Sequence, residues 1–396
     1  MLSLLEQLSG SYGPFRLFGY TSVRVVGAAL TAFLLMWLIM PGLIAWLRHK
    51  KFGEQGGKGE GADIVDAMRE AKAGTPTMGG LGLISCAALS AILWCHPAEP
   101  QSWLLLATML AFGFLGFLDD RAKVFKGAVG MSKRVKMALQ FIIGIACGIG
   151  FVIFDDAQII HKIEPLWVGP KDTGSWEWTV ASEGGRSAVR HHITMPFLSL
   201  DYALNATAIG VVAWCLVMTF ACSNSVNFTD GMDGLAAGTM LISALAYMVI
   251  AYLASHFVAC YYLGIFHVPG AQEVAVFCAA IAGACLGFLW FNAAPAQVFM
   301  GDTGSQALGG VLAMVSLCAK QEFLILLVGF VFFMEGASVL LQVGYFKATG
   351  GKRLLRCAPI HHHFQYKGWP ETTIVFRFWV IAALSALLAL ATLKLR

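Results

Sequence analysis

The sequence predicts an all-α integral membrane protein with about ten transmembrane helices, and three observations support this fold class. Hydrophobic residues make up 58% of the 396 residues, and charged residues only 13%, about half the share usual in soluble proteins. Long stretches carry no charge at all, for example Val25–Leu47. Because a helix needs about 20 mostly apolar residues to cross a bilayer, the composition excludes a soluble enzyme, a disordered protein and a secreted disulfide scaffold.

Each expected span is an apolar run of suitable length. The runs cover residues 23–47, 78–96, 101–118, 136–154, 202–224, 235–255, 274–291, 305–319, 323–345 and 373–394. The last two each carry one charged residue within their apolar stretch, Glu335 and Arg377. No internal repeat is visible, so we expect residues 1–396 to form a single polytopic membrane domain.

The positions of Lys and Arg predict the orientation. If both termini lie in the periplasm, the first, second and last cytoplasmic loops hold most of these residues, as the positive-inside rule requires. The long polar segment 155–201 then forms a small periplasmic hairpin or cap. The five cytoplasmic loops, which we expect to form the active site, are residues 48–77, 119–135, 225–234, 292–304 and 346–372.

Acidic and amide residues gather at the cytoplasmic ends of the expected spans. Ionisable groups at this depth usually mark a functional site. Carboxylates that converge from three loops repel each other, so they need a bound cation or a nearby Lys, and their hard oxygen atoms suit Mg²⁺. The residues of this set are Asp119, Asp120, Asn224, Asn227, Asp230, Asp233, Asn292 and Asp302.

A Gly-rich turn in the first cytoplasmic loop adds to this pattern. Residues 74–80, which follow Lys72, lead directly into an expected helix. Such a turn is expected to present free N–H groups to a phosphate or another anion. Together with the basic loops and the carboxylates, the turn indicates a phosphorylated substrate.

Three motifs resemble other sites but fail in detail. A calcium loop beginning at Asp230 would need a Glu at its twelfth position, where the chain has Leu241. Intramembrane aspartyl proteases would need Gly at Phe299, two residues before Gly301. Three consecutive histidines, residues 361–363, do not easily chelate one tetrahedral zinc ion, and we expect them to face phosphates instead.

Each functional feature also has a purely structural explanation. The Asp119–Asp120 pair alone is compatible with a solvated helix end, and the glycines of residues 74–80 with a simple helix cap. Glu335 is compatible with a packed, hydrogen-bonded carboxylate inside a helix. The convergence of acids from several loops is what favours a site.

Five segments in the five cytoplasmic loops carry a family resemblance. They are Lys72–Gly80, Gly116–Lys123, Asn227–Leu235, Phe299–Ser305, and a fifth that runs from Gln342 to Glu371. In this order they resemble the polyprenyl-phosphate N-acetylhexosamine-1-phosphate transferase family, and the fifth is similar to its muramoyl-pentapeptide branch rather than to relatives that transfer GlcNAc-1-phosphate. Two features depart from the family: Arg121 stands where an aromatic residue is usual, and segment 155–201 is unusually long.

The resemblance implies a reaction. UDP-MurNAc-pentapeptide and undecaprenyl phosphate would give lipid I and UMP, with Mg²⁺ as cofactor, at the cytoplasmic side of the bacterial inner membrane. It also implies that the protein contacts membrane lipid and forms a homodimer. The modest net charge of +4 gives no reason to expect a nucleic-acid partner.

The resemblance further implies roles for individual residues. Asp302 would bind Mg²⁺, Asp119 would act on the lipid phosphate as a base, and Asp120 would support them. The uridine moiety would be bound by Lys72, Thr77, Asn227, Asp230, Gly231, Asp233, Asn292 and Phe299, and Asn224 is a further candidate for substrate binding. The phosphates or the sugar-peptide would be bound by Lys123, Lys136, Gln342, His361, His362 and His363. A direct attack by the lipid phosphate and a covalent Asp intermediate both remain possible at this point.

Two non-enzymatic functions are also conceivable for a polytopic membrane protein. A transporter usually places binding groups at the membrane midplane and shows inverted repeats, whereas the polar residues here gather at one face. A structural subunit would leave several costly carboxylates without a purpose. The sequence therefore favours a transferase.

Overall fold

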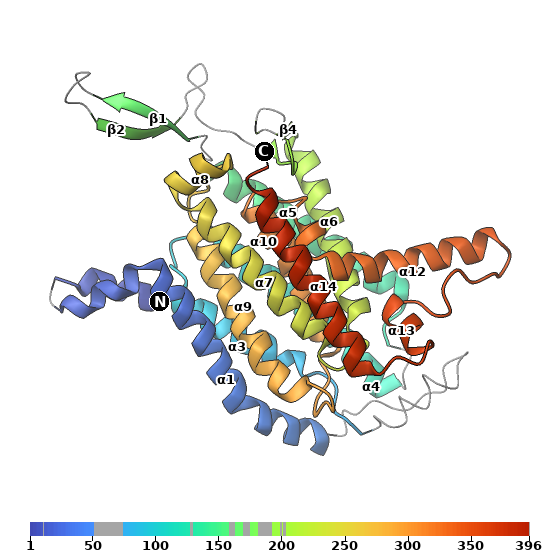
Figure 1. Ribbon diagram of the computed structural model, residues 1–396. Coiled ribbons are helices and arrows are strands. Elements are labelled where there is room, and N and C mark those ends of the chain that lie inside the picture. Colours follow the sequence, from blue (N-terminus) through green and yellow to red (C-terminus); the bar gives the residue numbers. More distant parts are fainter. Residues whose placement is uncertain are drawn as a thin grey trace.

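The computed structural model describes residues 1–10, 12–50, 74–126, 130–157, 163–168, 175–180, 192–198, 200 and 203–395. The predicted site residue Lys72, most of loop 48–77 and parts of segment 155–201 lie outside these ranges. The described residues are mostly helical, in agreement with the predicted fold class (Figure 1).

The described elements follow each other along the chain in this order. They are η1 (Leu2–Leu8), η2 (Gly13–Gly19), α1 (Thr21–His49), α3 (Gly80–Trp94), α4 (Pro100–Lys126), α5 (Lys133–Ala157), β1 (Ile163–Val168), β2 (Ser175–Val180), β3 (His192–Ile193), β4 (Leu204–Asn205), α6 (Ala208–Thr229), α7 (Leu235–Ala254), α8 (Phe257–Leu263), α9 (Ala271–Asn292), α10 (Gly301–Cys318), α11 (Ile325–Val328), α12 (Phe330–Ala348), α13 (Ile360–Gln365) and α14 (Glu371–Thr392).

Within the described ranges, seven helices are long and apolar enough to cross a membrane: α1, α4, α5, α6, α7, α9 and α14. Each of the other expected spans also coincides with helical structure, but α3 has only 15 residues. The expected span 323–345 is divided at Gly329 into α11 and α12. Gly is a weak helix former, and after it α12 leaves the bundle sideways (Figure 1). The total number of spans stays a prediction.

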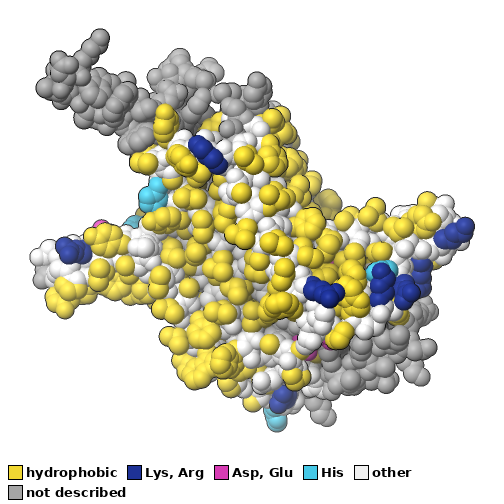
Figure 2. Space-filling model, viewed as in Figure 1, with side chains coloured by type: hydrophobic (Ala, Val, Ile, Leu, Met, Phe, Trp, Pro, Cys, Tyr) yellow, Lys and Arg dark blue, Asp and Glu magenta, His cyan; other side chains and the backbone are white. Residues whose placement is uncertain are grey.

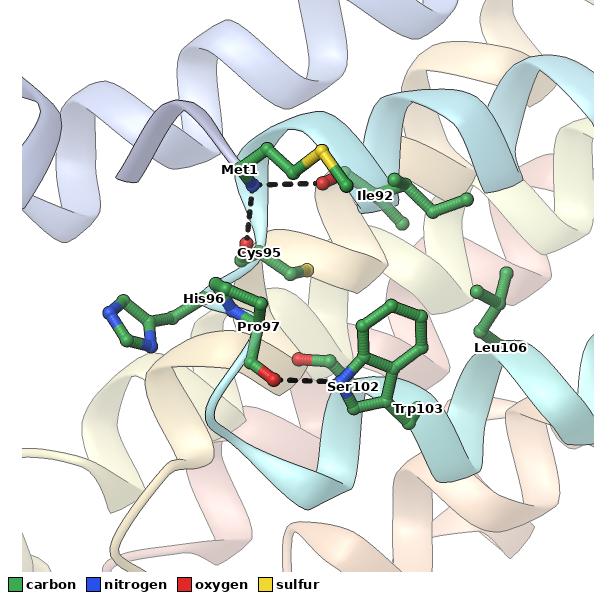
Figure 3. Close-up of a pocket in the computed structure, with 9 residues that line it drawn as sticks. Met1, Ile92, Cys95, His96, Pro97, Ser102, Trp103 and Leu106 are labelled. Carbon is green, nitrogen blue, oxygen red and sulfur yellow. Dashed lines mark hydrogen bonds between the residues drawn. The ribbon is translucent and has the colours of Figure 1, made fainter. Parts of the chain in front are cut away.

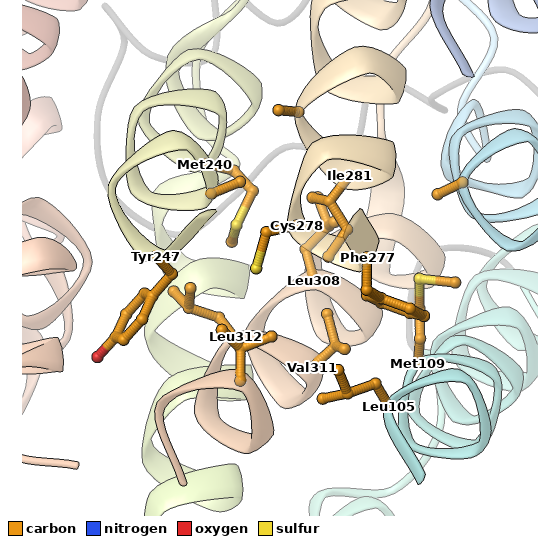
Figure 4. Packing of buried hydrophobic residues seen from close by; sticks show 14 of the residues in the cluster. Leu105, Met109, Met240, Tyr247, Phe277, Cys278, Ile281, Leu308, Val311 and Leu312 are labelled. Carbon is orange, nitrogen blue, oxygen red and sulfur yellow. The ribbon is translucent and has the colours of Figure 1, made fainter. Parts of the chain in front are cut away.

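The core lies around α9 and α10. Nearly every residue of both helices is buried, and apolar side chains of α4, α7, α9 and α10 meet between them (Figure 4). Glycines let the helices that carry the site approach closely. A Cβ atom on Gly116 of α4 would lie 2.1 Å from the carbonyl oxygen of Asp302, and one on Gly309 of α10 would lie 2.5 Å from that of Cys222.

Segment 155–201, for which a small hairpin or cap was expected, contains strands β1, β2 and β3. β1 pairs with β2 in antiparallel fashion, with Ile163 opposite Val180. A second short pair joins β3 to β4. The C-terminus lies at the same end of the bundle as these strands (Figure 1). Hydrophobic side chains cover most of the face shown in Figure 2, as expected for a surface that contacts lipid.

Candidate active site

Carboxylates from two helices meet around two lysine side chains. Lys136 of α5 donates a 3.0 Å hydrogen bond to Asp119 Oδ2 and also contacts Asp302 Oδ2. Lys123 lies 2.7 Å from Asp302 Oδ1 and 3.3 Å from Asp119 Oδ2. The side chain of Lys123 is 39% exposed, whereas that of Asp119 is 5% exposed. The lysines therefore balance the charge of acids that would otherwise repel each other.

Asp120 shares Lys123 with its neighbour, at 3.6 Å from Asp120 Oδ1, but its other partners differ. Its carboxylate accepts hydrogen bonds from the backbone N–H of Asp302 (3.1 Å) and of Thr303 (2.9 Å), and from Thr303 Oγ1 (2.7 Å). These N–H groups begin helix α10, so a buried carboxylate on α4 caps α10 in the manner of an N-cap residue. Asp120 thereby fixes the position of Asp302 relative to Asp119.

Asp230 joins the same cluster from the end of α6. Its Oδ2 atom accepts a 3.1 Å hydrogen bond from the N–H of Gly301. Burial, and next the charges of Asp302 and Asp120, raise the pKa of Asp230 to about 8. The predicted acids at positions 119, 120, 230 and 302 are thus brought together from three separate parts of the chain.

Amide side chains extend the cluster into the bundle. Gln306 donates to Asp302 Oδ2 at 3.3 Å and accepts from Gln140 at 3.3 Å, and Gln140 pairs with Asn224. The sequence analysis missed both glutamines. Gln140 follows Lys136 by four residues, and Gln306 follows Asp302 by four residues. This spacing puts each glutamine on the same helix face as a predicted site residue and could have identified it.

Two N–H groups of the Gly-rich turn are not free, contrary to our expectation. The N–H of Gly79 donates to the carbonyl of Phe299, and that of Gly80 donates to the carbonyl of Met300. A Cβ atom on Gly80 would lie 2.3 Å from the nitrogen of Gly304. The anion-site expectation is therefore wrong for Gly79 and Gly80, which join the start of α3 to the start of α10.

Comparison with known proteins identifies the family of the chain. Residues 102–320 match glycosyl transferase family 4. The phospho-N-acetylmuramoyl-pentapeptide-transferases of Maridesulfovibrio salexigens, Solidesulfovibrio magneticus and Desulfosudis oleivorans are 39%, 40% and 41% identical to the chain, and each alignment covers 99% of both proteins. The chain belongs to the phospho-N-acetylmuramoyl-pentapeptide-transferase family. The resemblance of the sequence motifs to this branch is thereby confirmed.

The first histidine of the triplet is enclosed rather than exposed to a substrate. His361 Nδ1 lies 3.1 Å from Glu335 Oε2, and both side chains are 0% exposed. A Cβ atom on Gly231 would lie 2.4 Å from His361 Nε2. The expectation that His361 faces phosphates does not agree with this burial. In the structure it connects α12 to the loop that carries Asp230.

Gln342, on α12, and His363 accept hydrogen bonds from the backbone of the C-terminal loop. Gln342 Oε1 accepts hydrogen bonds from the N–H groups of Leu354 and Leu355. His363 Nδ1 accepts from the N–H of Arg356. His362 and His363 are half-buried, so parts of both rings remain accessible to a ligand.

Asp233 and Asn292 hold the loop that precedes α10. Asp233 Oδ2 accepts from the N–H of Ala296. Asn292 accepts from the N–H of Gly234 and donates to the carbonyl of Val298. These contacts place Phe299, which is half-buried, next to the cluster.

The remaining predicted uridine ligands lie around the start of α10. Asn227 donates to Ser305 Oγ at 2.8 Å. A Cβ atom on Gly301 would lie 3.0 Å from Thr77 Oγ1 and 2.8 Å from Asp120 Oδ2, so the half-buried Thr77 adjoins the acids.

The donor atoms at this site suit a shared magnesium ion. In the part of the chain that the structure describes, no three His, Cys, Asp or Glu side chains form a ready-made metal cage. Mg²⁺ is usually held by one or two carboxylates together with substrate phosphates and water. The hard oxygen atoms of Asp302, Asp119 and Asp120 fit this mode, with Asp302 nearest to both lysines.

A separate pocket lies at the far end of α3. Its lining includes Ile92, His96, Trp103 and Leu106 (Figure 3). At the opposite end of α3, Gly80 contacts the start of α10, the helix that carries Asp302, and a helix of 15 residues spans about 22 Å. This pocket therefore takes no part in the site.

Proposed function

We propose that the chain transfers phospho-MurNAc-pentapeptide from UDP-MurNAc-pentapeptide to undecaprenyl phosphate and forms lipid I and UMP, a step of peptidoglycan synthesis. Family membership supports this reaction. The observation that carries the assignment of the site is the cluster of Asp119 and Asp302 around Lys123 and Lys136. Phosphoryl transfer depends mainly on positioning and on charge stabilisation, and this cluster offers both.

The residues divide the work according to their contacts. Lys123 is the more exposed of the two lysines and is suited to contact the substrate diphosphate. Asp119 is the candidate base for the lipid phosphate, and Asp120 holds Asp302 in place. Asp302 is the candidate ligand of Mg²⁺, which would neutralise diphosphate charge and stabilise the departing UMP. Both a direct attack and a covalent Asp intermediate are compatible with this division.

The experiment is release of UMP by the purified protein. Asp302→Asn is expected to reduce UMP release by more than about 100-fold without unfolding the protein, whereas Glu6→Gln, a change at an exposed carboxylate of η1, leaves the rate unchanged. UDP-GlcNAc in place of the muramoyl substrate is expected to give no product. A near wild-type rate for Asp302→Asn would refute the metal assignment, and UMP release without undecaprenyl phosphate would favour the covalent route.

The orientation and assembly that we propose need their own tests. The basic loops support a site on the cytoplasmic side of the inner membrane, with both termini in the periplasm. A cysteine introduced at the exposed Lys133 should react with an impermeant maleimide in inverted vesicles and not in spheroplasts. The proposed homodimer predicts twice the chain mass in detergent, after correction for bound lipid.

A further inference from the structure

A layer of amide side chains lies one helical turn deeper than the charged cluster. Gln140 follows Lys136 by four residues on α5, and Gln306 follows Asp302 by four residues on α10. The two glutamines are 1% and 0% exposed. Asn224 of α6 completes the layer. Three helices therefore contribute an uncharged polar group to the same buried place, where an unpaired amide is costly.

The hydrogen bonds in this layer form a chain that ends on Asp302. Asn224 Nδ2 donates to Gln140 Oε1 (3.2 Å), Gln140 Nε2 donates to Gln306 Oε1 (3.3 Å), and Gln306 Nε2 donates to Asp302 Oδ2 (3.3 Å). Gln140 Nε2 also donates to Asn224 Oδ1 at 3.4 Å, which closes a reciprocal amide pair.

Both ends of the chain fix the direction of its amides. An ionised carboxylate only accepts hydrogen bonds, so Gln306 must turn its NH₂ group towards Asp302. At the other end, Asn224 Nδ2 also donates to the carbonyl of Phe220 at 2.8 Å, and a carbonyl only accepts as well. The oxygen of Gln306 is then free to accept from Gln140. Each amide can make these bonds in only one orientation.

We propose that Gln306, Gln140 and Asn224 are positioning residues that hold the carboxylate of Asp302 in its reactive orientation from the membrane side. The proposal rests on the catalytic role of Asp302 given above. The lysines that also hold Asp302 are partly exposed and are suited to move towards substrate phosphates. The hydrogen bond from Gln306 comes from the buried core, so it stays in place while the lysines move.

A purely structural role would give a different result from a positioning role. Amide side chains between membrane helices also stabilise the packing of those helices. If that were their only role, their loss would lower the stability of the protein without a specific effect on kcat. A displaced catalytic carboxylate lowers kcat, because small errors of position are costly in the transition state. Substrate binding, and with it KM, would change little.

The test compares Gln306→Met, Gln140→Met and the double variant in UMP release from UDP-MurNAc-pentapeptide with undecaprenyl phosphate. Gln306→Met is expected to lower kcat by about 10- to 100-fold, as for loss of a hydrogen bond to a charged group, with KM for the nucleotide within about twofold. Gln140→Met is expected to lower kcat less. The double variant should equal Gln306→Met, because both act through one bond.

Two comparisons keep the result unambiguous. Thr219→Val removes a different fully buried polar group, a hydroxyl on α6 whose hydrogen bonds stay within its own helix, and is expected to keep kcat within about twofold. Wild-type kcat in a folded Gln306→Met protein, or multiplicative losses in the double variant, would overturn the proposal. If Gln306→Met does not fold, Gln140→Met decides alone, since wild-type kcat there also overturns it. An active Asp302→Asn would instead refute the catalytic role of Asp302 and leave the proposed reaction standing, whereas no UMP release by the wild type would refute the proposed function.

Discussion

The carboxylate of Asp120 on α4 accepts hydrogen bonds from both the N–H and the hydroxyl of Thr303 on α10, at 2.9 and 2.7 Å. The two residues are 183 positions apart. Two adjacent aspartates thus have different main contacts: Asp119 contacts both lysines, whereas Asp120 contacts Lys123 alone and also holds the helix that carries Asp302.

This contact predicts a loss of stability in Asp120→Ala. The change leaves buried donors of α10 without a partner, which costs about 2 kcal/mol or more. The unfolding temperature in detergent should fall clearly. Asp120→Asn keeps one acceptor oxygen, so its unfolding temperature should fall less. Equal unfolding temperatures for the alanine variant and the wild type would contradict the capping role.

Lys136 contacts Asp119 and Asp302 at once, which predicts a strong effect of its removal. Lys136→Met removes a positive charge that balances the negative charges of both acids, and it should lower turnover by more than about 100-fold. Lys133 lies on the same helix and is exposed. Lys133→Met is therefore the matched control, with turnover within about twofold in the same assay. Similar losses in the two variants would point to general charge steering instead.

The close contact between Gly80 and Gly304 predicts an intolerance to any side chain. Gly80→Ala would place a Cβ atom 2.3 Å from a backbone nitrogen that cannot move aside, at a cost of about 1–3 kcal/mol or more. Gly344→Ala is the comparison, because nothing lies within 4 Å of that site on α12. It should be neutral or slightly stabilising. Unfolding temperatures in detergent distinguish the two outcomes.

The raised pKa of Asp230 predicts a pH-dependent stability. Its ordinary value is 3.8, and burial among other carboxylates raises the pKa to about 8. Between these values the folded protein holds a proton that the unfolded chain releases. The stability from this group is therefore complete below about pH 4 and is lost as the pH rises through about 8.

The measurement is the unfolding temperature in metal-free buffer from about pH 5 to about pH 9. It should decline with pH more steeply in the wild type than in Asp230→Asn. Added Mg²⁺ should raise the wild-type value most at the alkaline end, because a cation favours the charged carboxylate. Identical pH profiles in the wild type and the variant would show that the group does not titrate in this range.

The sequence predicted the fold class and the meeting of the acids because charge and hydropathy act locally. Apolar runs define helices, and charged residues such as Asp119 and Asp302 must lie at their ends. The break at Gly329 was not predicted, because the residues on both sides of it are equally apolar. Only packing against neighbouring helices determines that α12 turns away.

The roles of single site residues depended on partners that the sequence does not show. His361 looks like a ligand in a basic loop, yet it is buried against Glu335, from a helix that precedes it. The N–H groups of Gly79 and Gly80 looked free, yet carbonyls more than two hundred residues later accept their hydrogen bonds. Long-range pairs of this kind become visible only in three dimensions.

The junction between the starts of α3 and α10 has a consequence for biogenesis. A ribosome synthesises Gly79 long before it reaches Phe299. The acids of α4 also emerge before Lys136 and before the start of α10, which Asp120 caps. The nascent chain must therefore keep these groups hydrated or shielded until its later helices have been inserted. A chain that ends before α10 cannot form the site, however well its first helices enter the bilayer.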